Sequence, residues 1–369
     1  MKLKTLTLIF LLFCSNIFSQ NEWEEIGIIN STGSYDFTGG AVAVSNNGYI
    51  VATSSVSPHY GSTLETDFGF DEFDGSVKVS RAIFDFNGQL IGWEQIGQEL
   101  EGINSEMLGY SISLSGDGTI LAASAPGNDT QGITLGKVKV FRNINDNWIQ
   151  IGEDIVSPND NERFGHSISI SDNGQILAVG SVGNYGGIGG INGRVLVYEN
   201  INDNWIQLGG EILGSEPGDM FGFSVSLNNP GTILAVGAPF HDRFYNATPW
   251  TNQQGEVKVF HLSNNNWTEL GNTIETVGSV NGHWNALFGY SVSLNNDGNI
   301  LAIGNPDWRQ YSNAGALQTS AATGAVQTAI KTEMSMQFTQ LDFDFAQPTI
   351  EFRLQTDDDF QAQLVVLCP

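Results

Sequence analysis

The chain has 369 residues, and its 14 Lys and Arg residues are outnumbered by 40 Asp and Glu residues, which gives a formal net charge of −26 at neutral pH. A surface this acidic repels phosphate backbones and anionic lipid headgroups. We therefore expect no nucleic-acid partner and no membrane-surface partner. No segment after the N-terminus has the roughly 20 consecutive apolar residues that a membrane-spanning helix needs, so we expect no membrane insertion.

The N-terminal segment, residues 1–19, is typical of a secretory signal peptide. It has two lysines, an apolar stretch over Leu6–Phe13 and a small residue, Ser19, where cleavage would occur. Its removal takes away Lys2 and Lys4 and moves the formal charge from −26 to −28. Only one of the two cysteines, Cys368, would then remain, so no intrachain disulfide is expected. The protein is expected to be secreted or exposed at the cell surface.

One sequence pattern is repeated five times along the chain. Each copy alternates apolar residues with serine, reaches an Asn/Asp/Pro-Gly turn and continues into a more apolar run, which is the pattern of a β-hairpin. The copies are FTGGAVAVSNNGYIVATSS, LGYSISLSGDGTILAASAP, FGHSISISDNGQILAVGSV, FGFSVSLNNPGTILAVGAP and FGYSVSLNNDGNILAIGNP, with turn glycines at Gly48, Gly118, Gly174, Gly231 and Gly298.

Two further strands are predicted after each hairpin. The third strand begins at a glycine, at Gly75, Gly136, Gly193, Gly255 and, in weakened form, Gly315. The fourth strand carries a tryptophan, at Trp93, Trp148, Trp205 and Trp267. The repeat is thus a four-stranded antiparallel unit, and the chain is predicted to be all-β.

The second strand of the repeat decides the architecture. In Ile233–Ala238 both faces are apolar, so this strand must be covered on both sides. Four-stranded units that stack face to face are the blades of a β-propeller. The repeat is longer than the roughly 40 to 50 residues of WD40 and kelch units, which argues against both.

The runs F-G-x-S-V-S, L-A-V-G-A-P and G-x-V-x-V-F resemble the FG-GAP repeat of integrin α-subunit propellers and of secreted bacterial repeat proteins. The resemblance covers about residues 22–318, and we assign residues 20–320 to the propeller. It implies calcium sites of the form D-x-D-x-D-G inside the hairpins. The hairpins here read SNNG, SGDG, SDNG, NNPG and NNDG, with too few carboxylates for calcium. We expect turn chemistry there and no cofactor.

The ends of the repeat region define the blade number. EWEEIG, around Trp23, is an unattached fourth strand, and we expect it to complete the last unit, which gives five blades. Residues 321–369 lose the repeat but keep strand-like alternation. This divergent, β-rich tail is open to three interpretations: a degenerate sixth blade, a small appended sheet, or the start of a further domain.

The connections between second and third strands, and between one repeat and the next, are long and differ from repeat to repeat. Varied loops on a repeated scaffold are where binding groups concentrate. We therefore predict a noncatalytic adhesion propeller that recognises a glycan or an extracellular protein through these loops, although any one ring could simply pack its own loop. The candidate ligand-binding residues are Tyr60, Tyr185, His241, Arg243, Tyr245, Trp250, Trp284, Trp308, Arg309 and Tyr311.

Two other functions remain open. The first is a glycoside hydrolase that uses Asp242 and Asp307, which stand at comparable positions in successive loops. The second is a structural spacer of the cell envelope. No metal site is predicted, because the acidic residues Asp71 and Asp74 are more typical of a solvated loop. A site that joins His241 and Asp242 to His283 is also weighed and set aside, since histidines so far apart in sequence are usually unrelated.

Overall fold

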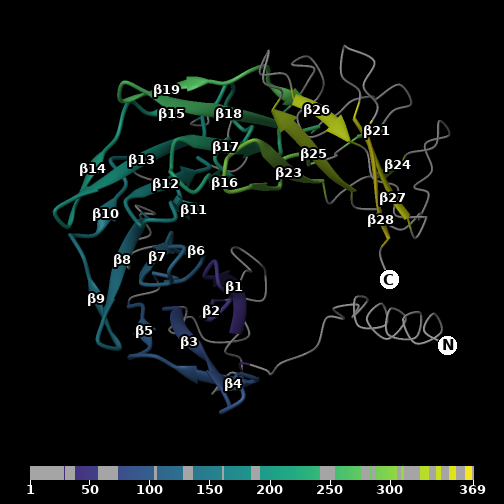
Figure 1. Cartoon of the computed structure of the whole chain (residues 1–369). Coiled ribbons are helices and arrows are strands. Elements are labelled where there is room, and N and C mark those ends of the chain that lie inside the picture. The colour runs from purple at the N-terminus through teal and green to yellow at the C-terminus, as the bar shows by residue number, and fades with distance from the viewer. Residues whose placement is uncertain are drawn as a thin grey trace, which may run out of the picture. The chain divides into compact units, whose positions relative to one another are not determined.

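A computed structural model describes residues 29, 38–56, 74–103, 106–127, 136–159, 162–183, 192–241, 254–275, 283–284, 287–305, 309–310, 325–331, 338–341, 349–354 and 362–367. Its elements in these ranges are all strands, as predicted (Figure 1). No helix that could cross a membrane is found in the same ranges.

The chain divides into two compact units. One contains Met1–Ile29 and Ala82–Glu94, and the other contains Asn30–Arg81 and Gln95–Pro369. The described part of the smaller unit is mainly a hairpin over residues 82–94. Its turn is held by Asp85, whose Oδ1 accepts the N–H groups of Asn87 and Gln89, both at 2.8 Å.

The described strands form successive antiparallel sheets along the chain. The first has the order β1-β2-β3-β4, with β5 also on β3, over β1 (Thr38–Val44), β2 (Ile50–Ser55), β3 (Ser76–Phe84), β4 (Leu90–Gln95) and β5 (Leu100–Glu101). In the second, β8 pairs with β7, β9 and β10, and β6 pairs with β7, over β6 (Ile112–Leu114), β7 (Ile120–Ala125), β8 (Lys137–Ile144), β9 (Asn147–Gln150) and β10 (Ile155–Val156).

The third and fourth sheets repeat the first. The third has the order β11-β12-β13-β14 with β15 on β13, over β11 (Phe164–Ile170), β12 (Ile176–Ser181), β13 (Arg194–Ile201), β14 (Asn204–Gln207) and β15 (Ile212–Leu213). The fourth has the order β16-β17-β18-β19 with β20 on β18, over β16 (Ser224–Leu227), β17 (Ile233–Ala238), β18 (Glu256–Ser263), β19 (Asn266–Glu269) and β20 (Ile274–Glu275). These sheets are the predicted four-stranded blades of a β-propeller-like fold, each with one short extra strand.

The fifth sheet differs from the prediction in its outer strands. It has the order β22-β23-β25-β26, over β22 (Ser291–Leu294), β23 (Ile300–Asn305), β25 (Ala325–Lys331) and β26 (Phe338–Leu341). Its third strand was expected at Gly315 and its fourth at Trp23, and both residues lie outside the described ranges. Two short pairs complete the strand inventory: β21 (His283–Trp284) with β24 (Arg309–Gln310), and β27 (Thr349–Leu354) with β28 (Ala362–Leu367).

The second strands confirm the expectation that both faces are covered. All six residues are buried in each of β7, β12 and β17. Close approach of the next sheet explains the small residues in these strands. A Cβ placed on Gly237 of β17 would lie 2.0 Å from the carbonyl oxygen of Gly289, which precedes β22. The sheets can pack this closely only because no side chain stands between their backbones.

Hydrogen bonds join the first strands of successive sheets. A series of backbone hydrogen bonds links the hairpin turns of successive sheets. Each N–H donates to the carbonyl oxygen of the residue named after it, at 2.8 to 3.0 Å, in the order Asn46, Gly116, Asp172, Asn229 and Asn296. The alternating serines of the repeat add side-chain bonds. Ser169 Oγ accepts the N–H of Leu227 at 3.0 Å, and Ser226 Oγ accepts that of Leu294 at 2.9 Å. The serines of the first strands therefore link successive sheets by hydrogen bonds.

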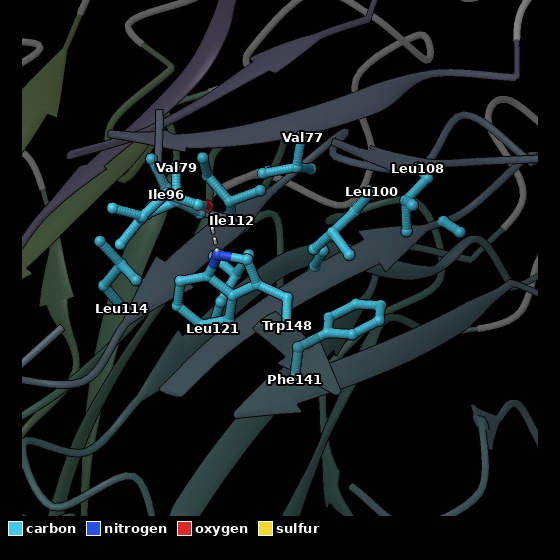
Figure 2. Close-up of a cluster of buried hydrophobic side chains, with 13 residues drawn as sticks. Val77, Val79, Ile96, Leu100, Leu108, Ile112, Leu114, Leu121, Phe141 and Trp148 are labelled. Atoms are coloured by element: carbon cyan, nitrogen blue, oxygen red, sulfur yellow. Dashed lines mark hydrogen bonds between the residues drawn. The ribbon is translucent and has the colours of Figure 1, made fainter. Parts of the chain in front are cut away.

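The tryptophan of the fourth strand also joins neighbouring sheets. Figure 2 shows Trp148, which is 2% exposed, packed among Val79, Ile96 and Leu121, with its Nε1–H donating to the Ile96 carbonyl at 3.1 Å. The same bond recurs at Trp205 and Trp267, whose Nε1 groups donate to the carbonyls of Ile151 and Leu208 at 3.3 and 3.1 Å. Each indole is thus hydrogen-bonded to the sheet that precedes its own sheet in the chain.

A row of rings crosses four successive sheets near the start of their first strands. The ring row consists of Tyr110, His166, Phe223 and Tyr290, each following the glycine of the Leu/Phe-Gly motif. Neighbouring ring centroids lie 5.4, 4.6 and 4.7 Å apart along this sequence. Burial lowers the pKa of His166 to about 4, with a further contribution from the positive charge of Arg163. The ring row is therefore uncharged at neutral pH.

The glycine that begins the third strand gives a test of the contact between sheets. Gly136 has φ +65°, and a Cβ there would lie 2.3 Å from the Phe164 carbonyl oxygen of the next sheet. Gly48 has a similar φ of +74° but nothing within 4 Å of its Cβ position. We expect Gly48→Ala to cost about 1–2 kcal/mol of unfolding free energy from backbone strain alone. Gly136→Ala should cost about 2–5 kcal/mol because overpacking adds to that strain. Urea unfolding measures the difference, and equal losses would show that the sheets do not meet at Gly136.

The uncharged state of His166 predicts that the folded protein loses stability in acid. Its pKa in the folded chain, about 4, lies below the ordinary 6.5, so the unfolded chain binds more protons between these values. The stability from this residue is fully present above pH 6.5 and is lost as the pH falls towards 4. The loss should amount to about 3 kcal/mol for a shift of this size. His166→Phe should flatten this part of the pH–stability curve measured by urea unfolding. An unchanged slope would show that His166 titrates normally.

Candidate functional site

A buried acidic residue stands at the same place in three successive repeats, three positions before the glycine of the Leu/Phe-Gly motif. These residues are Glu106, Glu162 and Asp219. Each also accepts a backbone hydrogen bond at its carbonyl oxygen from the end of the second strand or just beyond, from Gly127, Gly183 and Phe240 at 2.9, 3.2 and 3.2 Å. The acidic position is thus part of the scaffold, and its carboxylate needs a partner in the protein interior.

In the second and third sheets that partner is a cation at the first residue of the third strand. Lys137 Nζ lies 2.6 Å from Glu106 Oε1, and Lys139 Nζ lies 3.1 Å from Glu106 Oε2. In the next sheet Arg194 pairs with Glu162. Each buried carboxylate is thus neutralised by one or two cations.

The fourth sheet breaks this rule, because Glu256 occupies the position of the cation at the start of β18. Asp219 and Glu256 are both buried, with side chains 6% and 4% exposed. His241, three residues after β17, enters between them. Its Nδ1 lies 2.8 Å from Asp219 Oδ2 and its Nε2 lies 3.7 Å from Glu256 Oε2. Lys258 Nζ lies 3.2 Å from Glu256 Oε1. We call these four residues the acid–histidine cluster.

The cluster holds its protons more tightly than isolated groups would. Burial lowers the pKa of His241, but the hydrogen bond to Asp219 and the negative charges of Glu256 and Asp219 outweigh burial, so this pKa is raised above 6.5. Burial raises the pKa of Glu256 above 4.5, although the charges of His241 and Lys258 oppose it. The two carboxylates therefore favour the protonated form of His241, and burial disfavours the charged form of Glu256.

The same residues are the kind that bind divalent cations. One candidate ligand atom each from Asp219, His241 and Glu256 lies within 4.8 Å of the others. The imidazole, however, stands between the two carboxylates and turns a different nitrogen to each one. The three groups would surround a single cation only after the ring turned away from Asp219. The arrangement suits proton transfer better than metal coordination.

The ring row reaches this cluster through Phe240. Its ring centroid lies 6.2 Å from that of Phe223, and its chain neighbour is His241. Phe240 and the imidazole of His241 are both partly exposed, whereas Asp219 and Glu256 are buried. Both ring nitrogens of His241 face buried carboxylates, and its chain neighbour Phe240 contacts the ring row.

Of the predicted ligand-binding residues, His241 belongs to the cluster. Trp284 and Arg309 lie on β21 and β24, whose backbones pair so that these two residues are opposite each other. His283 lies beside Trp284 on β21. Asp74 has its carbonyl oxygen bonded to the N–H of Leu108 at 2.8 Å. The other predicted residues lie outside the described ranges: Tyr60, Asp71, Tyr185, Asp242, Arg243, Tyr245, Trp250, Asp307, Trp308 and Tyr311.

The sequence prediction missed Asp219 and Glu256, the partners of His241. A signal for Glu256 was present in the aligned third strands GKVKVF, GRVLVY and GEVKVF, where an acid replaces a base at one position. Asp219 is seen only once its repeat equivalents Glu106 and Glu162 are known to be buried. The acid at position 256 becomes meaningful together with Asp219, because it removes the cation that the buried carboxylate of Asp219 requires.

Comparisons with known proteins give likenesses of fold. No protein-family model and no curated protein sequence matches the chain. Among solved structures, the periplasmic gluconolactonase of Pseudomonas aeruginosa is 15% identical, with 89% of this chain and 85% of that chain covered and a TM-score of 0.48. A candidate 6-phosphogluconolactonase of Bacteroides uniformis is 13% identical, with 82% and 83% covered and a TM-score of 0.46. A hypothetical selenium-binding protein of Sulfolobus tokodaii is 10% identical, with 80% and 64% covered and a TM-score of 0.45.

Two of these structures are named as lactonases. The comparisons therefore do not support the interpretation of the chain as a noncatalytic adhesion propeller, or the expectation that it is not an enzyme. The likeness extends to the fold and not to a substrate or to particular residues.

Proposed function

We propose that the chain is a hydrolase that cleaves carboxylic esters or lactones, with His241 as the general base. One observation carries the proposal. An imidazole is held at Nδ1 by a buried carboxylate and turns Nε2 towards a second one, at a place where the neighbouring repeats contain only ion pairs. Orientation of a histidine by a carboxylate is the arrangement by which proteins prepare this side chain to accept a proton.

The reaction follows from the roles of the two nitrogens. Nδ1–H donates to Asp219, so the lone pair of the neutral imidazole is on Nε2. Nε2 takes a proton from water while the water oxygen attacks the carbonyl carbon. The imidazolium that forms is stabilised by Asp219. When the carbon–oxygen bond breaks, the leaving oxygen takes the proton from Nε2–H, and the products are an acid and an alcohol.

Hydrolysis of a glycoside fits the described residues less well. That reaction needs two carboxyl groups separated by about 5–5.5 Å or about 6.5–9.5 Å, with the sugar between them. In the cluster the candidate oxygens of Asp219 and Glu256 lie within 4.8 Å of each other, and the His241 ring lies between the two side chains. The pair first considered for glycoside cleavage, Asp242 and Asp307, lies outside the described ranges.

We also infer that this hydrolase is exported and is built from FG-GAP-like repeats. Support for export comes from the leader-like residues 1–19, and support for the repeat assignment comes from the recurrent Phe-Gly motif. An exported enzyme would meet its substrate outside the inner membrane, in solution or at the cell surface.

The proposal predicts that His241→Gln abolishes ester hydrolysis. Glutamine keeps the size of the side chain but cannot accept the proton, so kcat/KM should fall by about 10²- to 10⁴-fold. The measurement is turnover of p-nitrophenyl acetate, p-nitrophenyl butyrate and a set of five- and six-membered lactones. The control is His261→Gln, which changes the histidine of β18 outside the cluster and should leave the rate unchanged. Absence of turnover of any ester or lactone, or full activity in His241→Gln, would overturn the proposal.

A second variant separates function from stability. Glu256→Lys converts GEVKVF of the fourth repeat into GKVKVF, the sequence of the second repeat, in which both lysines pair with Glu106. We expect Asp219 to gain an ordinary ion pair, so that the urea midpoint does not fall, while hydrolysis is lost because His241 faces a cation. Retention of activity would show that Glu256 has no part in the reaction.

A further inference from the structure

The first sheet leaves open the face that later sheets pack against their predecessor. Val42 and Val44 of β1 are 66% and 60% exposed. Counted back from the turn glycine, their equivalents in the second, third and fourth sheets are 7–9% exposed, and they are Ile112, Leu114, Ile168, Ile170, Val225 and Leu227. Each of these pairs belongs to a hydrophobic cluster shared with the preceding sheet. The apolar side of β1 is thus exposed to water at positions that the repeat buries against another sheet.

The fifth sheet leaves open the opposite face, which the other sheets turn to their successor. Ile300 begins β23 and is 44% exposed. In the earlier sheets the isoleucine at this position lies against the turn glycine of the next sheet, 2.7–2.9 Å from the place of a Cβ, in the pairs Ile50–Gly118, Ile120–Gly174, Ile176–Gly231 and Ile233–Gly298. Gly48, the turn glycine of the first sheet, has nothing within 4 Å of that place. In the described residues, Ile300 therefore lacks a glycine and Gly48 lacks an isoleucine.

The hydrogen bonds between sheets end at the same two faces. Each turn N–H donates to the carbonyl oxygen of the next turn, so the Asn46 carbonyl and the Asn296 N–H are the two ends of this series among the described residues. The serine five residues before a turn glycine accepts an N–H of the next first strand, in the pairs Ser169–Leu227 and Ser226–Leu294. At the same spacing, Ser293 of β22 is exposed and is matched to the N–H of Val44.

We propose that the first sheet of one molecule stacks on the fifth sheet of a second copy, head to tail. The open faces are the two halves of a contact that successive sheets make four times within the chain, and Gly48 over Ile300 completes a fifth. The exposure of Val42 and Val44 shows that the chain itself leaves the first half uncovered. Because the faces are unlike, the association is heterologous and continues until a ring closes or a row of copies extends. The inference does not depend on the proposed function.

The residues assigned to the contact are uncharged, whereas the whole chain carries a formal charge of −26. Copies therefore repel each other at low ionic strength, and the burial of apolar side chains opposes this repulsion. Sodium chloride at about 0.5 M screens charges beyond about 5 Å, so it should strengthen the association. We expect the mean mass from sedimentation velocity in this salt to rise between about 1 and 100 µM protein.

Two variants block one face each. Val44→Glu places a charge on the first sheet and Ile300→Glu places one on the fifth, and each should weaken association by about 100-fold or more because a carboxylate would be buried without a partner. An equimolar mixture should form a one-to-one dimer and nothing larger, since each variant keeps the face that the other has lost. Ser293→Glu replaces Ile300→Glu if that variant does not fold. The control is Val156→Glu, which changes a residue of β10 that is 54% exposed and should associate as the unchanged chain does.

Three outcomes would overturn the head-to-tail contact. A chain that is monomeric over the whole concentration range does not use its open faces for a second copy, whether its own ends meet or stay apart. Association that is lost in Val44→Glu but kept in Ile300→Glu means that two first sheets pair with each other. Association that both variants keep places the contact elsewhere. None of these measurements involves ester hydrolysis, so the hydrolase proposal is tested separately.

Discussion

The close contact between the backbones of successive sheets is the constraint on which the rest of the structure depends. Because β7, β12 and β17 are buried on both faces, each sheet must meet another one at each face. The distances leave no room for a Cβ at several glycines, including Gly237 against Gly289. Hydrophobic burial supplies the drive to stack, and the missing side chains set how closely the sheets approach. The Trp and Ser hydrogen bonds then fix the register between sheets.

This packing also explains why charged groups lie in the interior. The segment that enters each first strand buries its acidic residue, such as Glu106 or Asp219, whose carbonyl oxygen accepts an N–H from just beyond the second strand of the same repeat. A carboxylate at that depth requires a cation or a hydrogen-bonded partner. The start of the third strand is the nearest place that can supply one. Two fixed positions in the repeat are therefore electrostatically coupled, and a change at one alters the chemistry of the other.

The sequence predicted the sheets well because hairpin glycines, alternating serines and the fourth-strand tryptophan are local signals that act in every repeat. It predicted His241 as a binding residue but not its partners. Asp219 and Glu256 are 37 residues apart in the sequence and meet only through the packing of β17 and β18 with the segment before β16. The outer strands of the fifth sheet were misassigned for another reason. The Gly and Trp markers are lost there, so β25 and β26 carry only alternation, which does not identify their neighbours.

The position of Glu256 is costly for a residue with a purely structural role. A lysine or arginine there would neutralise Asp219, as Lys137 and Arg194 neutralise their own acids. The glutamate instead adds a second buried carboxylate, whose Oε1 accepts no well-aligned hydrogen bond although Lys258 lies 3.2 Å away. Burial of incompletely paired charge opposes folding. Where a repeat departs from its own stabilising rule without a structural gain, the departure points to a functional site. In this chain it coincides with the one described histidine that stands between two carboxylates.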